Sequence, residues 1–194
     1  MDGSDTTPVA AQSAPFEARA LRTALGSFVT GVTVVTAQDR FGKPHGLTAN
    51  SFNTVSLDPP LVLWSQSRQA SSYHVFRESE VFAVSILAEH QIDISNNFAS
   101  HKEDKFEGVS VDRTFCSLPV IADSSAWLYC RMVSCVDGGD HAIYIGEILK
   151  IAHNERPPLI FGGGRYLQAR PHYATRGAGA AAASDGVLVE SLHH

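Results

Sequence analysis

Alternating apolar and polar residues along most of the chain predict β-strands. We expect strands over residues 32–37, 46–57, 61–66, 81–87, 126–136, 142–152 and 159–161. The two longest are joined at Asp137-Gly138-Gly139-Asp140, a composition typical of a hairpin turn. Pro59-Pro60 separates the second strand from the third, because proline cannot donate to a sheet ladder.

Helical spacing is found in three segments, over residues 16–28, 71–78 and 90–99. In the first, one stripe carries the apolar residues Phe16, Ala20, Leu21, Ala24, Leu25 and Phe28. Residues 100–125 are expected to form mixed loop. Because the strands do not alternate regularly with helices, a doubly wound parallel sheet is not expected. A mainly β fold, an antiparallel barrel or sandwich with peripheral helices, fits better.

The length of 194 residues and the apolar fraction of 44% suit one globular domain flanked by tails. We expect the domain over residues 16–170. Residues 1–15 are rich in Ser, Thr, Ala and Pro and are predicted to be a disordered tail. Residues 171–194 are rich in Ala and Gly and are predicted to be a flexible tail or a helix that docks on a partner.

Charge and composition argue against several classes of function. The net charge of −5, without any cluster of Lys and Arg, argues against binding to nucleic acid. Three cysteines without a C-x-x-C pair, and histidines without ligand spacing, predict neither a disulfide framework nor a metal site. No secretory signal is recognised, and no apolar run approaches the roughly 20 residues of a membrane helix. We therefore expect a cytoplasmic protein that does not bind membranes.

The stretch GLTANSF, residues 46–52, carries more small polar side chains than a strand that only fills a core. Hydroxyl and amide groups of Thr48, Asn50 and Ser51, with backbone N–H groups, could converge on one phosphate. The alternative is a polar edge strand whose hydroxyls meet only water, and composition alone favours that alternative.

A second donor-rich turn follows the next strand and carries Ser65, Gln66, Ser67 and Ser71. It opens a predicted helix, so an anion could bind there, although Ser71 could instead be a simple N-cap. Because two donor-rich turns flank one Pro-Pro link, a shared anion site is more credible than a site at either turn alone. His141 opens the last long strand; it could contact a ligand, or it could be a capping histidine bonded to Asp140.

The sequence contains no recognisable nucleotide-binding glycine motif, nucleophile elbow or catalytic acid–base pair. A phosphate-binding site without a set of catalytic side chains suits a reaction whose chemistry is supplied by a cofactor. Hydride transfer between a nicotinamide and a flavin requires the protein only to stack and orient the two rings.

The order of several motifs resembles the short-chain flavin reductase family, the reductase components of two-component flavin-dependent monooxygenases. The resemblance covers residues 16–168 and rests on FEARALRTALGSFVTGVTVVTA, GKPHGLTANSFNTVSLDPPLVLWSQS, SSYHVFRESEVFAVSILAEHQIDISNNFAS, GGDHAIYIGEI and PPLIFGGGRY. It implies a split β-barrel that forms a homodimer with the flavin near the subunit interface. It also implies oxidation of NADH or NADPH with reduction of FMN or FAD, and transfer of the reduced flavin to a separate monooxygenase.

The resemblance also implies roles for individual residues. His141 would face the nicotinamide, and Lys105 would reach the phosphate. Trp64 departs from the family pattern, which commonly has smaller residues at this position, and could alter the dinucleotide end of the pocket. The implied flavin-binding residues are Thr30, Val32 and Thr33; Thr48, Ala49, Asn50 and Ser51; Ser65, Gln66, Ser67 and Ser71; Phe98 and Ala99; Lys105; and Tyr166.

Two alternative functions remain open at this point. One is reduction of another acceptor, a cobalt corrin or ferric iron, through bound flavin. The other is a non-catalytic flavin-binding or sensing module on the same barrel. The enzyme needs room for a nicotinamide beside His141, and the module does not.

Overall fold

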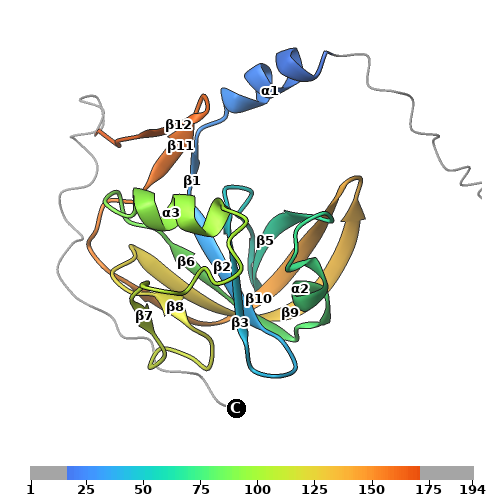
Figure 1. Ribbon diagram of the computed structural model, residues 1–194, viewed down its shortest axis with the longest axis vertical. Helices are drawn as coiled ribbons and strands as arrows, with labels where there is room; N and C mark the ends of the chain where they lie inside the picture. Colours follow the sequence, from blue (N-terminus) through green and yellow to red (C-terminus); the bar gives the residue numbers. More distant parts are fainter. Residues whose placement is uncertain (1–16, 171–194) are drawn as a thin grey trace, which may run out of the picture.

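A strongly bent seven-stranded antiparallel sheet forms the body of the molecule in the computed structural model, which describes residues 17–170 (Figure 1). The strand order is β3-β2-β6-β9-β10-β5-β4. The bounds are Thr33–Gln38 for β2, Pro44–Ala49 for β3, Asn53–Leu57 for β4, Pro60–Ser67 for β5, Val81–Ile86 for β6, Ala126–Gly138 for β9 and His141–His153 for β10. The mainly β prediction is confirmed. The predicted tails, residues 1–15 and 171–194, lie outside the described residues.

The prediction of one continuous strand over residues 46–57 is wrong. β3 ends at Ala49, β4 begins at Asn53, and the two strands lie at opposite edges of the sheet. Residues 50–52 therefore cross from one edge to the other. Ser51 Oγ donates to the carbonyl oxygen of Ser65 at 3.0 Å and accepts from its backbone N–H at 2.9 Å. A side chain thus holds the crossing segment to β5 where the backbone ladder is interrupted.

A second, three-stranded sheet in the order β1-β11-β12 lies beside the first and involves both ends of the described chain (Figure 1). Its strands are Thr30–Gly31, Ile160–Gly162 and Arg165–Leu167. The strand expected at residues 159–161 is present, but β12 was not predicted. The turn before β12 uses Gly163 and Gly164, whose φ angles of 58° and 76° favour glycine.

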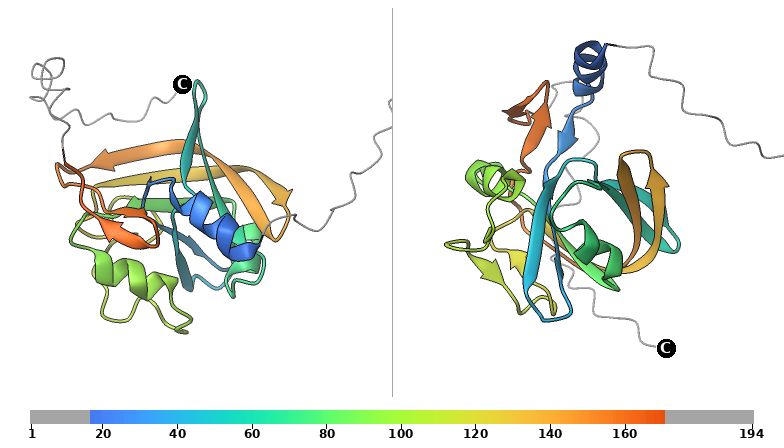
Figure 2. Two further views of the ribbon diagram at one scale, coloured as in Figure 1. Left: turned by 90° about the horizontal axis from the view of Figure 1, so that it is seen from above. Right: turned by 45° about the vertical axis from the view of Figure 1, so that its right-hand side comes forward.

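Three helices are present among residues 17–170: α1 at Ala18–Gly26, α2 at Tyr73–Glu78 and α3 at Ile92–Ala99. Figure 2 shows α2 between the β2–β3 end of the sheet and its β9–β10 side. α1 has no buried residue, so its apolar stripe does not pack on the core of this chain. The segment 100–125 is not only loop, because β7 (Val111–Asp112) and β8 (Val120–Ile121) pair within it.

Aromatic side chains fill the core between α2 and the sheet. Trp64 is fully buried and stacks on Tyr144 with ring centroids 4.6 Å apart, and it meets Phe76 edge-on at 5.0 Å. Trp64 therefore packs in the core, and the expectation that its side chain alters the dinucleotide end of the pocket finds no support. Alternation along β5 turns Trp64 inward with Val62 and Gln66. Within the described part of the chain, no helix is both long and apolar enough to cross a membrane.

Candidate functional site

One face of α3, the end of β3 and the β11–β12 hairpin enclose a cavity of about 210 Å³, which we call the α3 cavity. Its lining combines apolar walls with hydroxyl and amide groups. The lining residues are Val32, Thr48, Asn50, Ser95, Ala99, Phe161 and Tyr166. Five of these were predicted from the sequence, whereas Ser95 and Phe161 were not.

Hydrogen bonds to α3 fix the two polar walls of the α3 cavity. Thr48 Oγ1 donates to the Ser95 carbonyl oxygen at 2.6 Å, which ties β3 to the helix. The Tyr166 hydroxyl lies 2.9 Å from Ser95 Oγ and 2.8 Å from Asn96 Oδ1, which ties β12 to the same turn. The Phe161 ring meets the Tyr166 ring edge-on at 5.4 Å and supplies a flat apolar wall.

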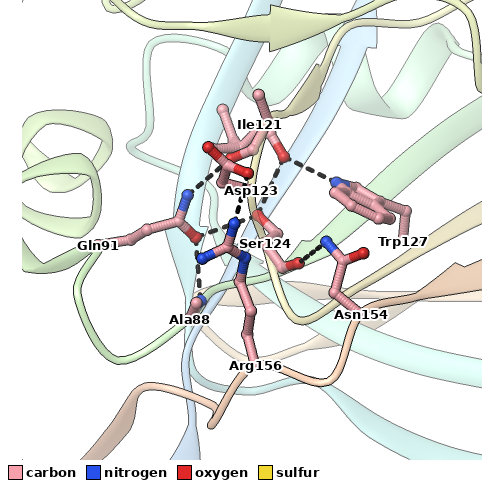
Figure 3. Close-up of polar contacts among 9 residues, drawn as sticks. Ala88, Gln91, Ile121, Asp123, Ser124, Trp127, Asn154 and Arg156 are labelled. Carbon is pink, nitrogen blue, oxygen red and sulfur yellow. Dashed lines mark hydrogen bonds and ion pairs between the residues drawn. The ribbon is translucent and has the colours of Figure 1, made fainter.

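A buried polar network fixes where α3 begins (Figure 3). Gln91 Oε1 accepts from the Ala88 backbone N–H at 2.9 Å and from Ser124 Oγ at 3.2 Å, while its Nε2 donates to the Ala122 carbonyl at 2.7 Å. Asn154 Nδ2 donates to the Ser124 carbonyl at 3.0 Å and extends the network to the residue after β10. The network therefore fixes the position of α3, the helix whose residue Ser95 lines the α3 cavity.

A second cavity, of about 160 Å³, opens between β3, the start of α2 and residues 102–106, and we call it the β3–α2 cavity. Its polar lining is mostly hydroxyl and cationic. It includes Ser71, Ser72, Lys43, Lys102 and Lys105, with Glu103 and Asp104 as the acidic members. The structure therefore places Ser71 and Lys105, which the resemblance assigns to the phosphate, on one cavity.

The two cavities adjoin the same strand. Residues 43–46, at the start of β3, line the β3–α2 cavity, and Thr48 and Asn50, at and just after its end, line the α3 cavity. An elongated ligand could therefore extend along β3 from one cavity to the other. Gly46 allows α3 to approach there, because a Cβ at this position would lie 2.6 Å from the Phe98 ring.

Lys105 is the cation most firmly held at the β3–α2 cavity. Its Nζ donates to the Phe98 carbonyl oxygen at 2.9 Å, and burial lowers the pKa of the ammonium below its usual 10.5. The side chain is thus pre-positioned at the end of α3. Oxygen acceptors of an anion could replace the hydration that burial removes.

The sequence profile of the flavin reductase like domain matches residues 25–170. The chain belongs to this family. The resemblance that the sequence motifs indicated is therefore confirmed.

Individual relatives of this flavin reductase-like chain carry more specific names. The chain is 48% identical over 130 residues to the reductase component of a flavin-dependent trigonelline monooxygenase from Acinetobacter baylyi, covering 67% of this chain and 42% of that protein. It is 43% identical over 148 residues to SmoA, an FMN reductase (NADH) from Agrobacterium fabrum, covering 76% and 84%.

The NADH:FAD oxidoreductase SgcE6 from Streptomyces globisporus, solved in complex with NAD and FAD fragments, superimposes with a TM-score of 0.74. It shares 37% identity and covers 79% of this chain and 93% of SgcE6. The predicted split-barrel fold is confirmed by this likeness. The chain spans between 42% and 66% of the length of several curated relatives it matches, namely 50%, 66% and 42%.

Several residues predicted to bind flavin have side chains that face the protein interior in this flavin reductase-like domain. Thr33 donates to the Ala49 carbonyl at 2.7 Å, and Phe98 is fully buried against Phe106. Gln66 is 1% exposed and bonds to Ser72 and Tyr144. Their side chains line neither cavity, because alternation along the strands and the packing of α3 turn them inward.

Four other predicted residues also line neither cavity. Ser51 and Ser65 are joined by the bonds that hold the crossing segment, and Ser67 Oγ accepts from the Gln69 N–H at 3.3 Å. Ala49 is buried at the end of β3. These residues shape the two turns, and a ligand role for them stays a prediction.

Thr30 offers a hydrogen-bonding group beside the α3 cavity. Its Oγ1 is buried and has no partner within residues 17–170. In the small sheet, Thr30 is paired with Phe161, which lines that cavity. A buried hydroxyl without a partner is costly, so the position suits the polar edge of a bound ring.

His141 lies apart from both cavities. It opens β10, paired with Ser67, and its Nδ1 lies 2.7 Å from Asp140 Oδ1. Its side chain is 43% exposed. This geometry matches the capping histidine that the sequence left open as an alternative. The structure does not bring His141 together with the α3 cavity, and its contact with a nicotinamide stays a prediction.

Proposed function

We propose that the chain is an NAD(P)H:flavin oxidoreductase that reduces FMN or FAD and supplies the reduced flavin to a monooxygenase component. The observation that carries the proposal is the pair of cavities that adjoin β3, one at each end of the strand. One has flat apolar walls with hydroxyl and amide groups, and the other gathers serines and lysines. This arrangement suits a ligand with an aromatic ring at one end and a phosphate at the other.

The residues present fit a flavin. Ser71, Ser72 and Lys105 would hold the phosphate, because hydroxyls and an ammonium donate to its oxygens. Phe161 and Tyr166 would border the ring, and the unpartnered Thr30 hydroxyl would meet its polar edge. When bound, the flavin would accept a hydride from the reduced nicotinamide.

The chain's own contribution to the reaction is binding and orientation. The Tyr166 and Thr48 hydroxyls are anchored to α3, so the walls of the cavity are set before a ligand arrives. Pre-set walls hold two rings in reacting geometry at a low entropic cost. The apolar side chains of Val32 and Phe161 exclude water from one side of the ring.

The transfer of reduced flavin to a monooxygenase is supported by relatives whose names describe them as reductase components or subunits of such enzymes. A homodimer is supported by the apolar face of α1. Leu21 and Leu25 are 39% and 66% exposed on one side of that helix, and Phe28, two residues after it, is 73% exposed. A second copy of the chain could cover this surface, and two-fold dimers are the commonest oligomers. A cytoplasmic location stays a prediction.

A steady-state assay tests the proposed function. We expect the purified chain to accelerate the oxidation of NADH or NADPH when FMN or FAD is supplied, followed by the loss of nicotinamide absorbance. Binding of flavin without any oxidation of either nicotinamide would contradict the proposal and would favour a non-catalytic module. The dimer is tested separately by sizing with light scattering, where a monomeric mass at micromolar concentration would contradict it.

A further inference from the structure

A third cavity, of about 470 Å³, lies between α1 and the tip of the β11–β12 hairpin. We call it the α1 cavity, and it is lined by Arg19, Arg22, Thr23, Gly26, Gly163 and Gly164. The four α1 residues share one face of the helix, since residues three and four apart are neighbours. The apolar residues Leu21 and Leu25 lie on the opposite face, so the two arginines are turned toward the hairpin.

The α1 cavity is positively charged in a chain whose net charge is −5. Neither residues 18–38 nor residues 157–170 contain an Asp or Glu. Arg19 and Arg22 form no ion pair with any residue that the structure describes, whereas Arg68, Arg131 and Arg156 all do. Two guanidinium groups that form no ion pair within residues 17–170 and line one cavity are suited to bind phosphate oxygens.

The hairpin connects the α1 cavity to the α3 cavity. Phe161 and Tyr166 line the α3 cavity and pair with one another, and Gly162 and Arg165 are the next pair toward the tip. Gly163 at the tip is two residues beyond Phe161, or about 7 Å at the usual rise of a strand. A ribose could bridge this distance between a ring in one cavity and a phosphate in the other.

The α1 cavity and the β3–α2 cavity share no lining residue: the first lies between α1 and the hairpin tip, and the second between the start of β3, the start of α2 and residues 102–106. Figure 1 shows α1 and the β11–β12 hairpin at one end and the β2–β3 turn, next to Lys43 and Pro44 of the β3–α2 cavity, at the other. A flavin whose ring fills the α3 cavity and whose phosphate fills the β3–α2 cavity therefore extends away from the arginines. This direction leaves the α1 cavity open to a second molecule that carries phosphate.

We propose that Arg19 and Arg22 bind the phosphates of the nicotinamide dinucleotide that donates the hydride. This inference rests on the proposed reductase function and adds the site for the second substrate. The nicotinamide ring would lie at the α3 cavity, and its pyrophosphate would lie between α1 and the Gly163-Gly164 turn. The arginines recognise charge and do not touch the reacting atoms.

The test compares hydride donors with and without phosphate. NADH and the phosphate-free donor N-benzyl-dihydronicotinamide are each used to reduce FMN by the wild type and by the double variant Arg19→Ala, Arg22→Ala. We expect KM for NADH to rise about 5- to 20-fold in the double variant, as for two partly exposed charge-assisted contacts. KM for the phosphate-free donor serves as the reference, because that donor has no phosphate that the arginines could bind. Arg113→Ala, which removes an exposed arginine that lines none of the three cavities, should leave both values unchanged.

A binding measurement separates the inference from the reaction itself. ADP-ribose carries the pyrophosphate without the nicotinamide, and calorimetry should show its Kd rise in the double variant by a similar factor. An unchanged KM for NADH would overturn the inference, as would an equal loss for both donors, which would make the arginines structural. If the wild type reduces flavin with neither donor, the reductase function fails instead, and the ADP-ribose titration still decides the role of the arginines.

Discussion

Gln66 Nε2 donates to Ser72 Oγ across 3.1 Å at the edge of the β3–α2 cavity. The amide is held in this orientation because the Tyr144 hydroxyl donates to Gln66 Oε1 at 3.2 Å. Since the Ser72 oxygen accepts from Gln66, its own proton is free to point into the cavity. The buried amide thereby positions a donor for a phosphate that it does not itself touch.

Gln66→Leu should selectively weaken the binding of phosphorylated flavin. Losing the orientation of one hydroxyl corresponds to about a 2- to 12-fold rise in the Kd of FMN. The Kd of riboflavin, which has no phosphate, should remain within about two-fold, and the folded state should lose about 1–3 kcal/mol because the Tyr144 hydroxyl loses its acceptor. Quenching of flavin fluorescence gives both constants, and urea unfolding gives the stability.

A matched control is Gln69→Leu, which removes an exposed amide from the same turn and should change neither flavin constant. If FMN and riboflavin weaken equally in Gln66→Leu, the residue supports the fold alone and Ser72 is not a phosphate donor.

Gly46→Ala should destabilise the protein by about 1–3 kcal/mol, as expected when a methyl group is forced into a packed contact. The added Cβ would lie 2.6 Å and 2.9 Å from two atoms of the Phe98 ring and 3.2 Å from Phe106. Because Phe98 is fully buried, the ring cannot move aside without displacing α3. Thermal or urea unfolding measures the loss. Gly31→Ala is the control for stability, since a Cβ there meets nothing within 4 Å. Equal stability of the two variants would contradict the close approach of α3 to β3.

Much of the fold could be predicted because the burial of one face of a strand or helix imposes a regular spacing of apolar residues along the sequence. The strands β9 and β10 read clearly as alternating runs, whereas β6 reads as a short apolar run and is buried on both faces. The break at Asn50-Ser51-Phe52 could not be predicted in this way. Alternation continues through it, and only the bonds between Ser51 and Ser65, residues far apart in sequence, show that the chain changes edge.

The residues of the site could also be predicted only in part. Thr48 and Asn50 stand out as donors within a strand, and Lys105 was implied by the family resemblance. Ser95 and Phe161 carry no such signal: Ser95 is an ordinary polar residue of a short helix, and Phe161 is an ordinary apolar residue of a short strand. Their place on the α3 cavity depends on how α3 packs against the β11–β12 hairpin. Conversely, Gln66 and Thr33 looked like ligand donors, but their strands turn them inward.

The affinity for FMN should fall as pH rises through the lowered pKa of Lys105. Burial favours the neutral amine, so the charge that attracts a phosphate is lost at a pH below the usual 10.5. The contribution to stability has the opposite sign. The unfolded chain holds this proton more tightly, so deprotonation in the same range favours the folded state.

Titrations of FMN and riboflavin across alkaline pH check the prediction for Lys105. Riboflavin shares the ionisation of the flavin ring, so the difference between the two ligands reports on the phosphate alone. Lys105→Met should abolish the difference in pH dependence, whereas Lys150→Met, at an exposed lysine bonded to the Phe115 carbonyl, should retain it. A wild-type difference that survives in Lys105→Met would assign the phosphate contact to another cation.

His141→Ala separates a nicotinamide contact from a structural cap. If His141 contacts the nicotinamide, its loss should raise KM for NADH about 2- to 12-fold, the equivalent of one hydrogen bond, while the Kd of flavin stays the same. Asp140→Asn is the companion variant: it removes the carboxylate that lies 2.7 Å from His141 Nδ1 but keeps an oxygen that can accept. It should therefore show a smaller effect in the same direction. The His141 ring lies outside the α3 cavity of its own chain. A parallel loss of flavin affinity and of stability in His141→Ala would therefore show that His141 caps the β9–β10 turn.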